Sequence, residues 1–278
     1  MIRRLYSIKH SFEKIVTYKP KNILITGSSS GIGASLAVFY AAPGVFLALT
    51  GRHAERLSNI AMICRDKGAI VEEAVLDVTD CQKMKQWIEK LDHNHPLDLV
   101  IANAGISGGT GGCGTGEPED QVRQIFDINL GGILNTVHAI LPLMQARKKG
   151  QIALMASLAS FSGWPGAPSY SASKGAVRLY GEALRSRLRT ENIKVNVICP
   201  GFIQTPMTAV NDYAMPFMME ADQAADFIAR GLEKNKGRIA FPWQTYFIAG
   251  FIGILPYWIS SGLLKKLPEK PPSSSINS

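Results

Sequence analysis

Residues 26–33 read TGSSSGIG, and this loop joins a short apolar run, residues 22–26, to a helix-length segment, residues 31–42. Glycine adopts positive φ at little cost and lets a ligand come close to the backbone. The free amides at a helix N-terminus attract negative charge. Because an expected strand and an expected helix flank the loop directly, the pattern predicts a turn that binds a pyrophosphate; a Gly/Ser linker is the alternative.

The rest of the chain repeats this alternation of short apolar runs and longer segments. The expected strands are residues 22–26, 45–50, 70–76, 97–102, 151–156 and 193–198, and the expected helices are residues 31–42, 54–67, 81–91, 119–147 and 170–190. This order predicts a parallel sheet with right-handed crossovers, covered on both faces. The predicted fold class is α/β, with a Rossmann-type doubly wound parallel sheet in a single domain and ligands bound beyond the carboxyl ends of the strands.

The composition suits one large domain and argues against several classes of protein. The chain has 278 residues, 46% of them hydrophobic, and a formal net charge of +8. Its basic residues are scattered and show no nucleic-acid-binding signature, so a nucleotide phosphate or an anionic membrane surface is the better expected partner. The four cysteines share no short spacing, which predicts no metal site and no disulfide framework and fits a cytoplasmic protein.

The end of the second expected strand bears on the choice of nucleotide. An NAD-binding fold offers an acidic residue to the ribose about twenty residues after the first glycine. Here the strand is followed by Gly51-Arg52, and a guanidinium binds a 2′-phosphate whereas a carboxylate repels it. The sequence therefore predicts NADP rather than NAD. The alternatives are that Arg52 is a surface charge, or that Glu55 is the acid; we expect Glu55 within the next helix.

Residues 169–174 read SYSASK and place Tyr170 and Lys174 four positions apart. On a helix this spacing puts both side chains on one face. A phenol has a free pKa of about 10, and a neighbouring ammonium lowers it. The pair is therefore a candidate acid/base, or else a tyrosine that packs beside a surface lysine.

A second glycine-rich stretch, residues 109–114, also fits the pattern GxGxxG. It does not join a strand to a helix in the required way. We expect the surrounding residues 108–116 to form a flexible loop beside the active site, with no phosphate role.

Several further motifs follow the first loop in a recognisable order. They are DV at residues 77–78, ANAG at residues 102–105, Ser157, and PG at residues 200–201 followed by Thr205. With TGSSSGIG and YSASK, they make residues 20–240 resemble the short-chain dehydrogenase/reductase family. Ala102 departs from the family's NNAG motif, which affects one stabilising side-chain contact and not the fold.

The resemblance implies a set of residues that contact the cofactor. With Arg52, the predicted cofactor-binding residues are Gly27, Ser29, Ser30, Gly31, Ile32, Gly33, Arg52, Asp77, Val78, Asn103, Ala104, Gly105, Tyr170, Lys174, Pro200, Gly201 and Thr205. Asp77 has an alternative role as an ordinary cap after a strand.

The resemblance also implies roles for four catalytic residues. Tyr170 would be the general acid/base, Lys174 would hold the ribose hydroxyls and lower the pKa of Tyr170, and Ser157 would hydrogen-bond the substrate oxygen. Asn129 would anchor a water that links Lys174 to solvent, or would simply bend its long helix. By position alone, Ser160 and Ser162 compete with Ser157.

The expected function is NADP-dependent interconversion of a ketone and a secondary alcohol by hydride transfer. One alternative is an NAD-dependent alcohol dehydrogenase of the same fold, and another is a non-catalytic dinucleotide-binding or scaffold protein. The substrate is expected to be a small molecule, with a lipid-like ketone among the options, and the protein is expected to form a homo-oligomer.

Both ends of the chain extend beyond the expected catalytic domain, residues 20–240. Residues 1–19 have basic and apolar residues at helical spacing, which predicts an amphipathic helix on a membrane surface or on the domain. Residues 241–267 are an apolar segment interrupted by Pro256, expected to contact a membrane surface, the substrate pocket or another subunit. Residues 268–278 are rich in Pro and Ser and are expected to be disordered.

Overall fold

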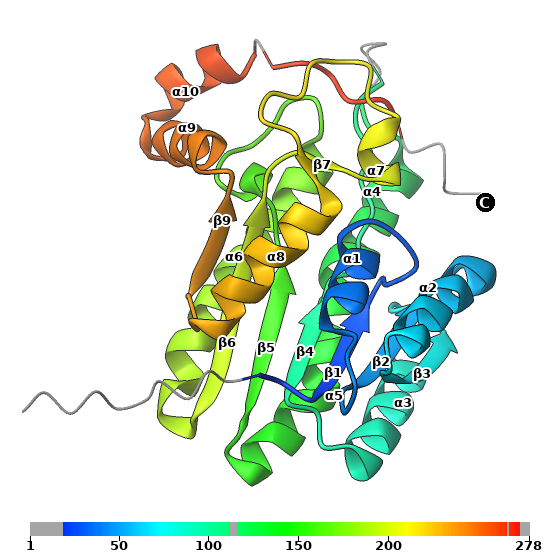
Figure 1. Cartoon of the computed structure of the whole chain (residues 1–278). Coiled ribbons are helices and arrows are strands. Elements are labelled where there is room, and N and C mark those ends of the chain that lie inside the picture. The colour runs from blue at the N-terminus through cyan, green and yellow to red at the C-terminus, as the bar shows by residue number, and fades with distance from the viewer. Residues whose placement is uncertain (1–18, 112–115, 266, 273–278) are drawn as a thin grey trace, which may run out of the picture.

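The structure is a computed structural model that describes residues 19–111, 116–265 and 267–272. Within these residues, seven parallel strands form one sheet in the order β3-β2-β1-β4-β5-β6-β9 (Figure 1). Their bounds are β1 Asn22–Thr26, β2 Phe46–Gly51, β3 Ile70–Val75, β4 Leu99–Ala102, β5 Gly150–Met155, β6 Ile193–Pro200 and β9 Arg238–Phe241. The winding reverses between β1 and β4, so the predicted doubly wound fold is confirmed.

Helices cover both faces of the sheet. One layer contains α1 (Gly31–Tyr40), α2 (Ala54–Asp66) and α8 (Ala221–Glu233), and the other contains α3 (Cys81–Asn94), α4 (Glu119–Phe126), α5 (Gly132–Arg147) and α6 (Pro168–Leu188). In β1, Ile23 and Ile25 face the first layer while Leu24 faces the second, the alternation of a strand. Each such buried side chain stabilises the fold by about 1.5–3 kcal/mol, which explains the apolar runs.

The structure adds elements that the sequence patterns did not predict. Strand β9, helix α8, the short helix α7 (Pro206–Ala209) and the two-residue strands β7 (Ile203–Gln204) and β8 (Met219–Glu220) all follow the last expected strand. The expected helix 119–147 is broken by a π-helical turn, Asp127–Gly131. Helix α6 begins at Pro168, two residues before the predicted start, because proline is favoured in the first turn of a helix.

The apolar C-terminal segment forms two short helices, α9 (Trp243–Ile254) and α10 (Tyr257–Leu264). Pro256 separates them and caps the N-terminus of α10. Among the described residues, no helix is long and apolar enough to span a membrane. Both helices lie beyond the end of β9, at the end of the sheet where the strands terminate (Figure 1).

The C-terminal residues differ from their prediction in part. Residues 267–272, which we call the strap, run back over the second glycine-rich stretch, at residues 109–111, and are not disordered. The backbone of Lys270 accepts a hydrogen bond from the amide of Gly111 at 3.0 Å, and Trp164 Nε1 donates to the carbonyl of Pro268 at 3.0 Å. The remaining residues with predicted roles at the two ends, 1–18 and 273–278, lie outside the described residues.

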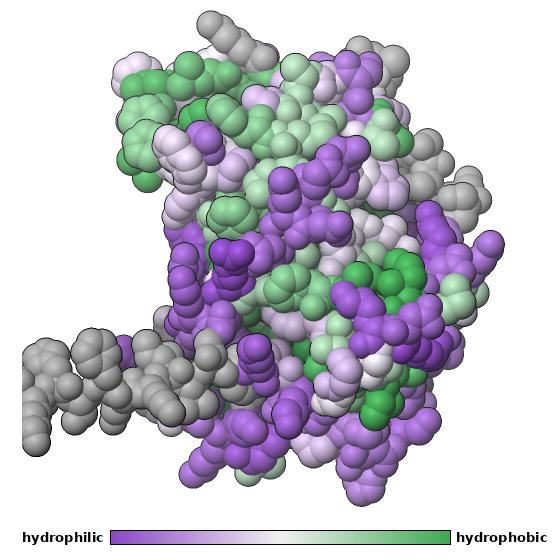
Figure 2. Space-filling model, in the orientation of Figure 1, coloured by the Kyte–Doolittle hydropathy of each residue, from purple (hydrophilic) through white to green (hydrophobic). Residues whose placement is uncertain are grey.

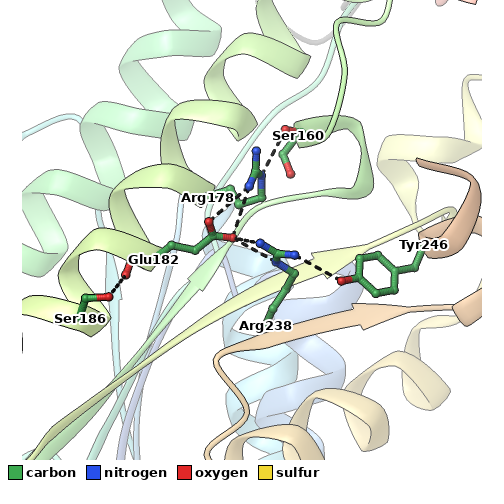
Figure 3. A network of polar contacts seen from close by, with 6 residues as sticks. All are labelled: Ser160, Arg178, Glu182, Ser186, Arg238 and Tyr246. Atoms are coloured by element: carbon green, nitrogen blue, oxygen red, sulfur yellow. Dashed lines mark hydrogen bonds and ion pairs between the residues drawn. The ribbon is translucent and has the colours of Figure 1, made fainter. Parts of the chain in front are cut away.

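A polar network fastens the C-terminal helices to the sheet and to α6 (Figure 3). Glu182 on α6 forms ion pairs with Arg178, at 3.3 Å, and with Arg238 on β9. Arg238 Nη1 also donates to the hydroxyl of Tyr246 on α9, at 3.3 Å. Both guanidinium groups lie over the ring of Phe161, which lets them pack while they remain paired.

Candidate active site

One cavity of about 800 Å³ lies beyond the carboxyl ends of β1, β2, β4, β5 and β6. This is where a doubly wound sheet binds its ligands. Of the predicted site residues, its wall contains Gly27, Ser29, Ser30, Gly31, Ile32, Arg52, Asp77, Val78, Asn103, Ala104, Gly105, Ser157, Tyr170, Lys174, Pro200, Gly201 and Thr205. Gly33 and Asn129 are not part of the wall and lie behind it.

The loop between β1 and α1 leaves backbone amides directed at the cavity. Gly31, the first residue of α1, has a φ of 56°, which favours glycine. Ser30 caps the helix without a side-chain hydrogen bond to its first turn, so those amides are available to an anion. The donors and the sharp turn fit the pyrophosphate of a dinucleotide.

Asn103 and Thr26 fix the shape of this loop from below. Asn103 Nδ2 donates to the carbonyl oxygens of Thr26, at 2.9 Å, and Gly27, at 3.1 Å. Thr26 Oγ1 accepts from the amides of Asn103 and Ala104 at 3.0 and 3.1 Å. The side chain of Asn103 therefore joins the ends of β1 and β4, a positioning task in addition to its place in the cavity wall.

The end of the cavity beside the carboxyl end of β2 is strongly basic. Arg52, His53 and Arg56 line it together, whereas Glu55 lies in α2 and is not part of the wall. Burial and the charges of Arg56 and Arg52 lower the pKa of His53. Arg56 was not predicted from the sequence, because an arginine at the start of an exposed helix carries no distinctive pattern of its own.

Asp77 and Thr205 flank the cavity on opposite sides. Asp77 Oδ1 accepts from the amide and the hydroxyl of Thr79 at 2.9 and 2.8 Å, so this carboxylate caps the turn after β3 while it lines the cavity. Thr205 forms a capping box with Thr208 at the start of α7, which holds the 203–208 segment beside Gly31.

Three of the predicted catalytic residues meet at the carboxyl end of β5. Ser157 follows β5, caps the short 3₁₀ helix Leu158–Ser160, and is hydrogen-bonded to Tyr170. The Nζ of Lys174 lies 5.9 Å from the centre of the Tyr170 ring and donates to the carbonyl of Met155 at 2.9 Å. Ser162 lines the cavity without such a bond to Tyr170, and Ser160 is not in the wall.

Asn129 supports this group from the π-helical turn. Its side chain accepts from the amide of Ile106 at 2.8 Å and donates to the carbonyl of Ile106 at 3.0 Å. It also donates to Ser173 Oγ on α6 at 3.1 Å. Such turns are frequent at functional sites, and here the turn brings a buried amide between β4 and α6. Asn129 thus both breaks the helix and braces the catalytic residues.

The pKa of Tyr170 departs from the prediction. Burial raises this pKa above its usual value, and the hydrogen bond from Ser157 only partly opposes the rise. The same burial lowers the pKa of Lys174 to about 8. Desolvation is the main cause of both shifts, so the expected lowering of the Tyr170 pKa by Lys174 is not found in this structure.

The substrate end of the cavity is formed mainly by segments that carried no motif. Its wall includes Trp164, Tyr213, residues of α9 and α10, and the strap. Tyr213 packs edge-on against Trp164 at 6.0 Å, and its hydroxyl has no hydrogen-bond partner among the described residues. Burial raises the pKa of Tyr213 to about 12. Residues 241–267 were expected to contact a membrane surface, the substrate pocket or another subunit. In the structure, side chains from this segment form part of the cavity wall.

Comparison with known protein families and curated sequences gives consistent matches. A family model described as short chain dehydrogenase matches residues 21–215. An uncharacterized oxidoreductase of Myxococcus xanthus is 37% identical over 237 residues, which cover 85% of this chain and 93% of that protein. One of Mycobacterium tuberculosis is 34% identical over 230 residues, covering 81% and 90% of the two chains.

Solved structures share the same fold. A short-chain dehydrogenase from Sphingobium yanoikuyae in complex with NADPH aligns with a TM-score of 0.74 at 24% identity, covering 89% of this chain and 96% of its own. One from Mycobacterium paratuberculosis bound to NAD gives 0.72 at 22% identity, with 82% and 98% covered. At these identities the likeness is one of fold.

Proposed function

Because the chain belongs to the short-chain dehydrogenase/reductase family, we propose that it is an NADP-dependent oxidoreductase that interconverts a ketone and a secondary alcohol. Membership makes it an oxidoreductase whose cofactor is a nicotinamide dinucleotide. The observation that carries the finer proposal is the meeting of Ser157, Tyr170 and Lys174 in the wall of the same cavity as the glycine loop.

The preference for NADP is supported by charge at the adenosine end. Arg52 and Arg56 both line the cavity there. None of the wall residues that come directly after β2 in the sequence is acidic. A guanidinium forms strong, charge-assisted hydrogen bonds to phosphate oxygens. Two of them beside the ribose would favour the cofactor that carries a 2′-phosphate.

Each of the catalytic side chains has a distinct task in this proposal. When bound, the nicotinamide supplies or accepts the hydride at the substrate carbon. The hydroxyl of Tyr170 donates a proton to the carbonyl oxygen in reduction and receives it back in oxidation. Ser157 donates a hydrogen bond to that oxygen and stabilises the charge that develops on it. Lys174, buried beside both, holds the ribose hydroxyls.

The raised pKa of Tyr170 is compatible with its role as proton donor in ketone reduction. A phenol whose pKa lies above its usual value is protonated at neutral pH and is ready to donate. Reductase activity should then be retained at neutral pH and fall as the pH rises through that pKa.

Replacement of Tyr170 by phenylalanine tests the assignment. We expect Tyr170→Phe to lower kcat for ketone reduction by about 10²–10⁴-fold, the usual contribution of a general acid. NADPH affinity, measured by fluorescence titration, should hardly change, because the ring is kept. Tyr180→Phe is the matched control, since Tyr180 lies on the same helix outside the cavity wall.

Two results would contradict the proposal in different ways. A Tyr170→Phe variant that keeps most of its kcat would show that another group transfers the proton. If the wild type binds NADPH but consumes it with none of a broad panel of ketones, the non-catalytic alternative gains support.

We also propose that the protein contacts a membrane surface through α9 and α10. Their outer side chains are strongly exposed, with 80% of Ile254, 84% of Tyr257 and 76% of Trp258 accessible to solvent. Figure 2 shows apolar residues gathered over these helices. Tyrosine and tryptophan favour the headgroup region of a bilayer. Sedimentation with lipid vesicles measures this contact.

A further inference from the structure

The strap carries a lysine into the substrate end of the cavity. Lys270 is only 5% exposed and is part of the cavity wall. Its Nζ donates to Ser107 Oγ at 2.6 Å and lies 5.6 Å from the centre of the Tyr170 ring. A side chain from the far end of the sequence therefore lies directly beside the proposed proton donor.

The backbone around Lys270 is held on both sides. Its carbonyl accepts from the amide of Gly111 at 3.0 Å, and its amide donates to the carbonyl of Gly166 at 3.4 Å. A side chain at Gly109 would collide with the strap, because a Cβ there would lie 2.4 Å from the Lys270 carbonyl oxygen. Because Gly109 has no side chain, the strap packs closely against residues 109–111. These contacts hold the backbone that positions the ammonium group of Lys270.

The charge of Lys270 has no counterion in the structure. Among the described residues, no carboxylate lies within ion-pair distance of its Nζ, and its one side-chain partner is the neutral hydroxyl of Ser107. Burial lowers the pKa of Lys270 to about 8, so the cation still predominates at neutral pH. A buried ammonium without a counterion is costly and rare, and an anion from outside the chain would compensate its charge.

The surrounding wall indicates what kind of anion fits. Ile252, Leu264 and Leu267 supply apolar surface, while the buried hydroxyl of Tyr213 has no partner among the described residues. In such surroundings a charge pair is screened less than in water. The cavity wall therefore combines a cation and an unpartnered hydroxyl with these apolar side chains.

We propose that Lys270 binds a carboxylate of the substrate, so that the preferred substrate is a ketone with an apolar body and a carboxylate close to the reacting carbonyl. The inference rests on the proposed function, because it takes the carbonyl to lie at Tyr170 and Ser157. It makes Lys270 a specificity-determining residue that selects which ketone enters.

Binding to the complex with oxidised cofactor tests this inference without turnover. Benzoylformate and its methyl ester share the ketone and the phenyl ring, and the ester carries a methyl group where the acid carries its negative charge. Calorimetric titration into the full chain saturated with NADP⁺ should give at least about tenfold tighter binding of the acid, as expected for a charge-assisted hydrogen bond. Lys270→Met should abolish this preference, and Lys270→Arg should keep most of it.

Lys265→Met, at an exposed lysine after α10, is the control for a change in net charge and should leave the acid-to-ester ratio as in the wild type. The inference is overturned if the wild type binds the acid no more tightly than the ester. It is also overturned if Lys270→Met keeps the preference, or if its main effect is weaker binding of NADP⁺ itself. A chain that prefers the acid but never oxidises NADPH with either ketone would instead refute the proposed function.

Discussion

Arg52 and Arg56 supply, at the end of the cavity beside β2, the positive charge on which the proposed preference for NADP depends. Both lie in the wall beside His53, and their charges contribute to the lowered pKa of that imidazole. Arg52 was predicted from its place after the second strand, since a residue that ends a parallel strand lies at the ligand-binding edge. Arg56 was not, because nothing local distinguishes it from other exposed arginines in a helix.

Reversing the charge at position 52 should change the cofactor preference. We expect Arg52→Asp to shift the ratio of kcat/KM for NADPH over NADH toward NADH by about tenfold or more, because a carboxylate repels the 2′-phosphate. Arg65→Asp, on the helix α2 that follows Arg52 but outside the cavity wall, should leave the ratio unchanged. An unaltered ratio in Arg52→Asp would show that this guanidinium does not read the phosphate.

Short motifs led to residues that the structure brings together in the cavity wall, whereas residues that only the tertiary fold brings there were missed. Ser157 directly follows β5, and Tyr170 and Lys174 lie four positions apart on α6, so their spacing along the chain nearly determines their meeting. Tyr213 and Lys270 lie in segments rich in turns and proline, without any periodic pattern. Only the path of the strap over Gly109 brings Lys270 to the site.

The helices and strands up to residue 200 follow the sequence prediction within a few residues. The central strands β1, β2, β4 and β5 read as continuous apolar runs because they are buried on both faces, whereas the edge strand β3 is partly exposed. Strand β9 was missed because it has only four residues and begins the apolar stretch that continues through α9 and α10. The break at Asp127–Gly131 was anticipated only as a bend, since a π-helical turn leaves no reliable pattern in sequence.

The ion pairs of Glu182 should stabilise the attachment of β9 and α9. We expect Glu182→Gln to lower the free energy of unfolding by about 1–2 kcal/mol, because two partly buried arginines lose their counterion. For a domain of this size that corresponds to a decrease in Tm of about 2–8 °C, measurable by calorimetry.

Glu119→Gln provides the comparison for that experiment. Glu119 also pairs with an arginine, Arg123, but both side chains are more than 70% exposed. A surface pair of this kind contributes less than about 1 kcal/mol. Equal losses of Tm in the two variants would contradict a special role for the network in Figure 3.

The molecule as a whole presents two unlike surfaces. Figure 2 shows polar residues over much of the visible surface and a cluster of apolar ones over α9 and α10. Ile248 belongs to both regions, since it lines the cavity and is 52% exposed. The apolar surface is therefore continuous with the substrate end of the cavity, which would let a lipid-dissolved ketone pass from bilayer to site.

This arrangement predicts binding to vesicles. We expect the protein to sediment with phosphatidylcholine vesicles, more strongly when phosphatidylserine is included because of the net charge of +8. Ile254→Glu should weaken partitioning by about tenfold or more, since one apolar side chain then no longer enters the bilayer.

Leu179→Glu is the matched control for that variant, because Leu179 is 60% exposed on α6. It should leave vesicle binding nearly as in the wild type. Equal binding by Ile254→Glu and the wild type would remove the membrane contact and favour a protein partner for α9 and α10.

The last strand of the central sheet ends at Phe241. The segments α9, α10 and the strap, which line the substrate end of the cavity, therefore follow all the proposed nucleotide-binding residues in the sequence. This arrangement makes the enzyme modular. Replacing the α9–α10–strap segment after residue 242 by that of a relative would change which substrates the cavity accepts. The proposed dinucleotide-binding residues would stay unchanged. New substrates could in this way arise from changes confined to one contiguous stretch of the gene.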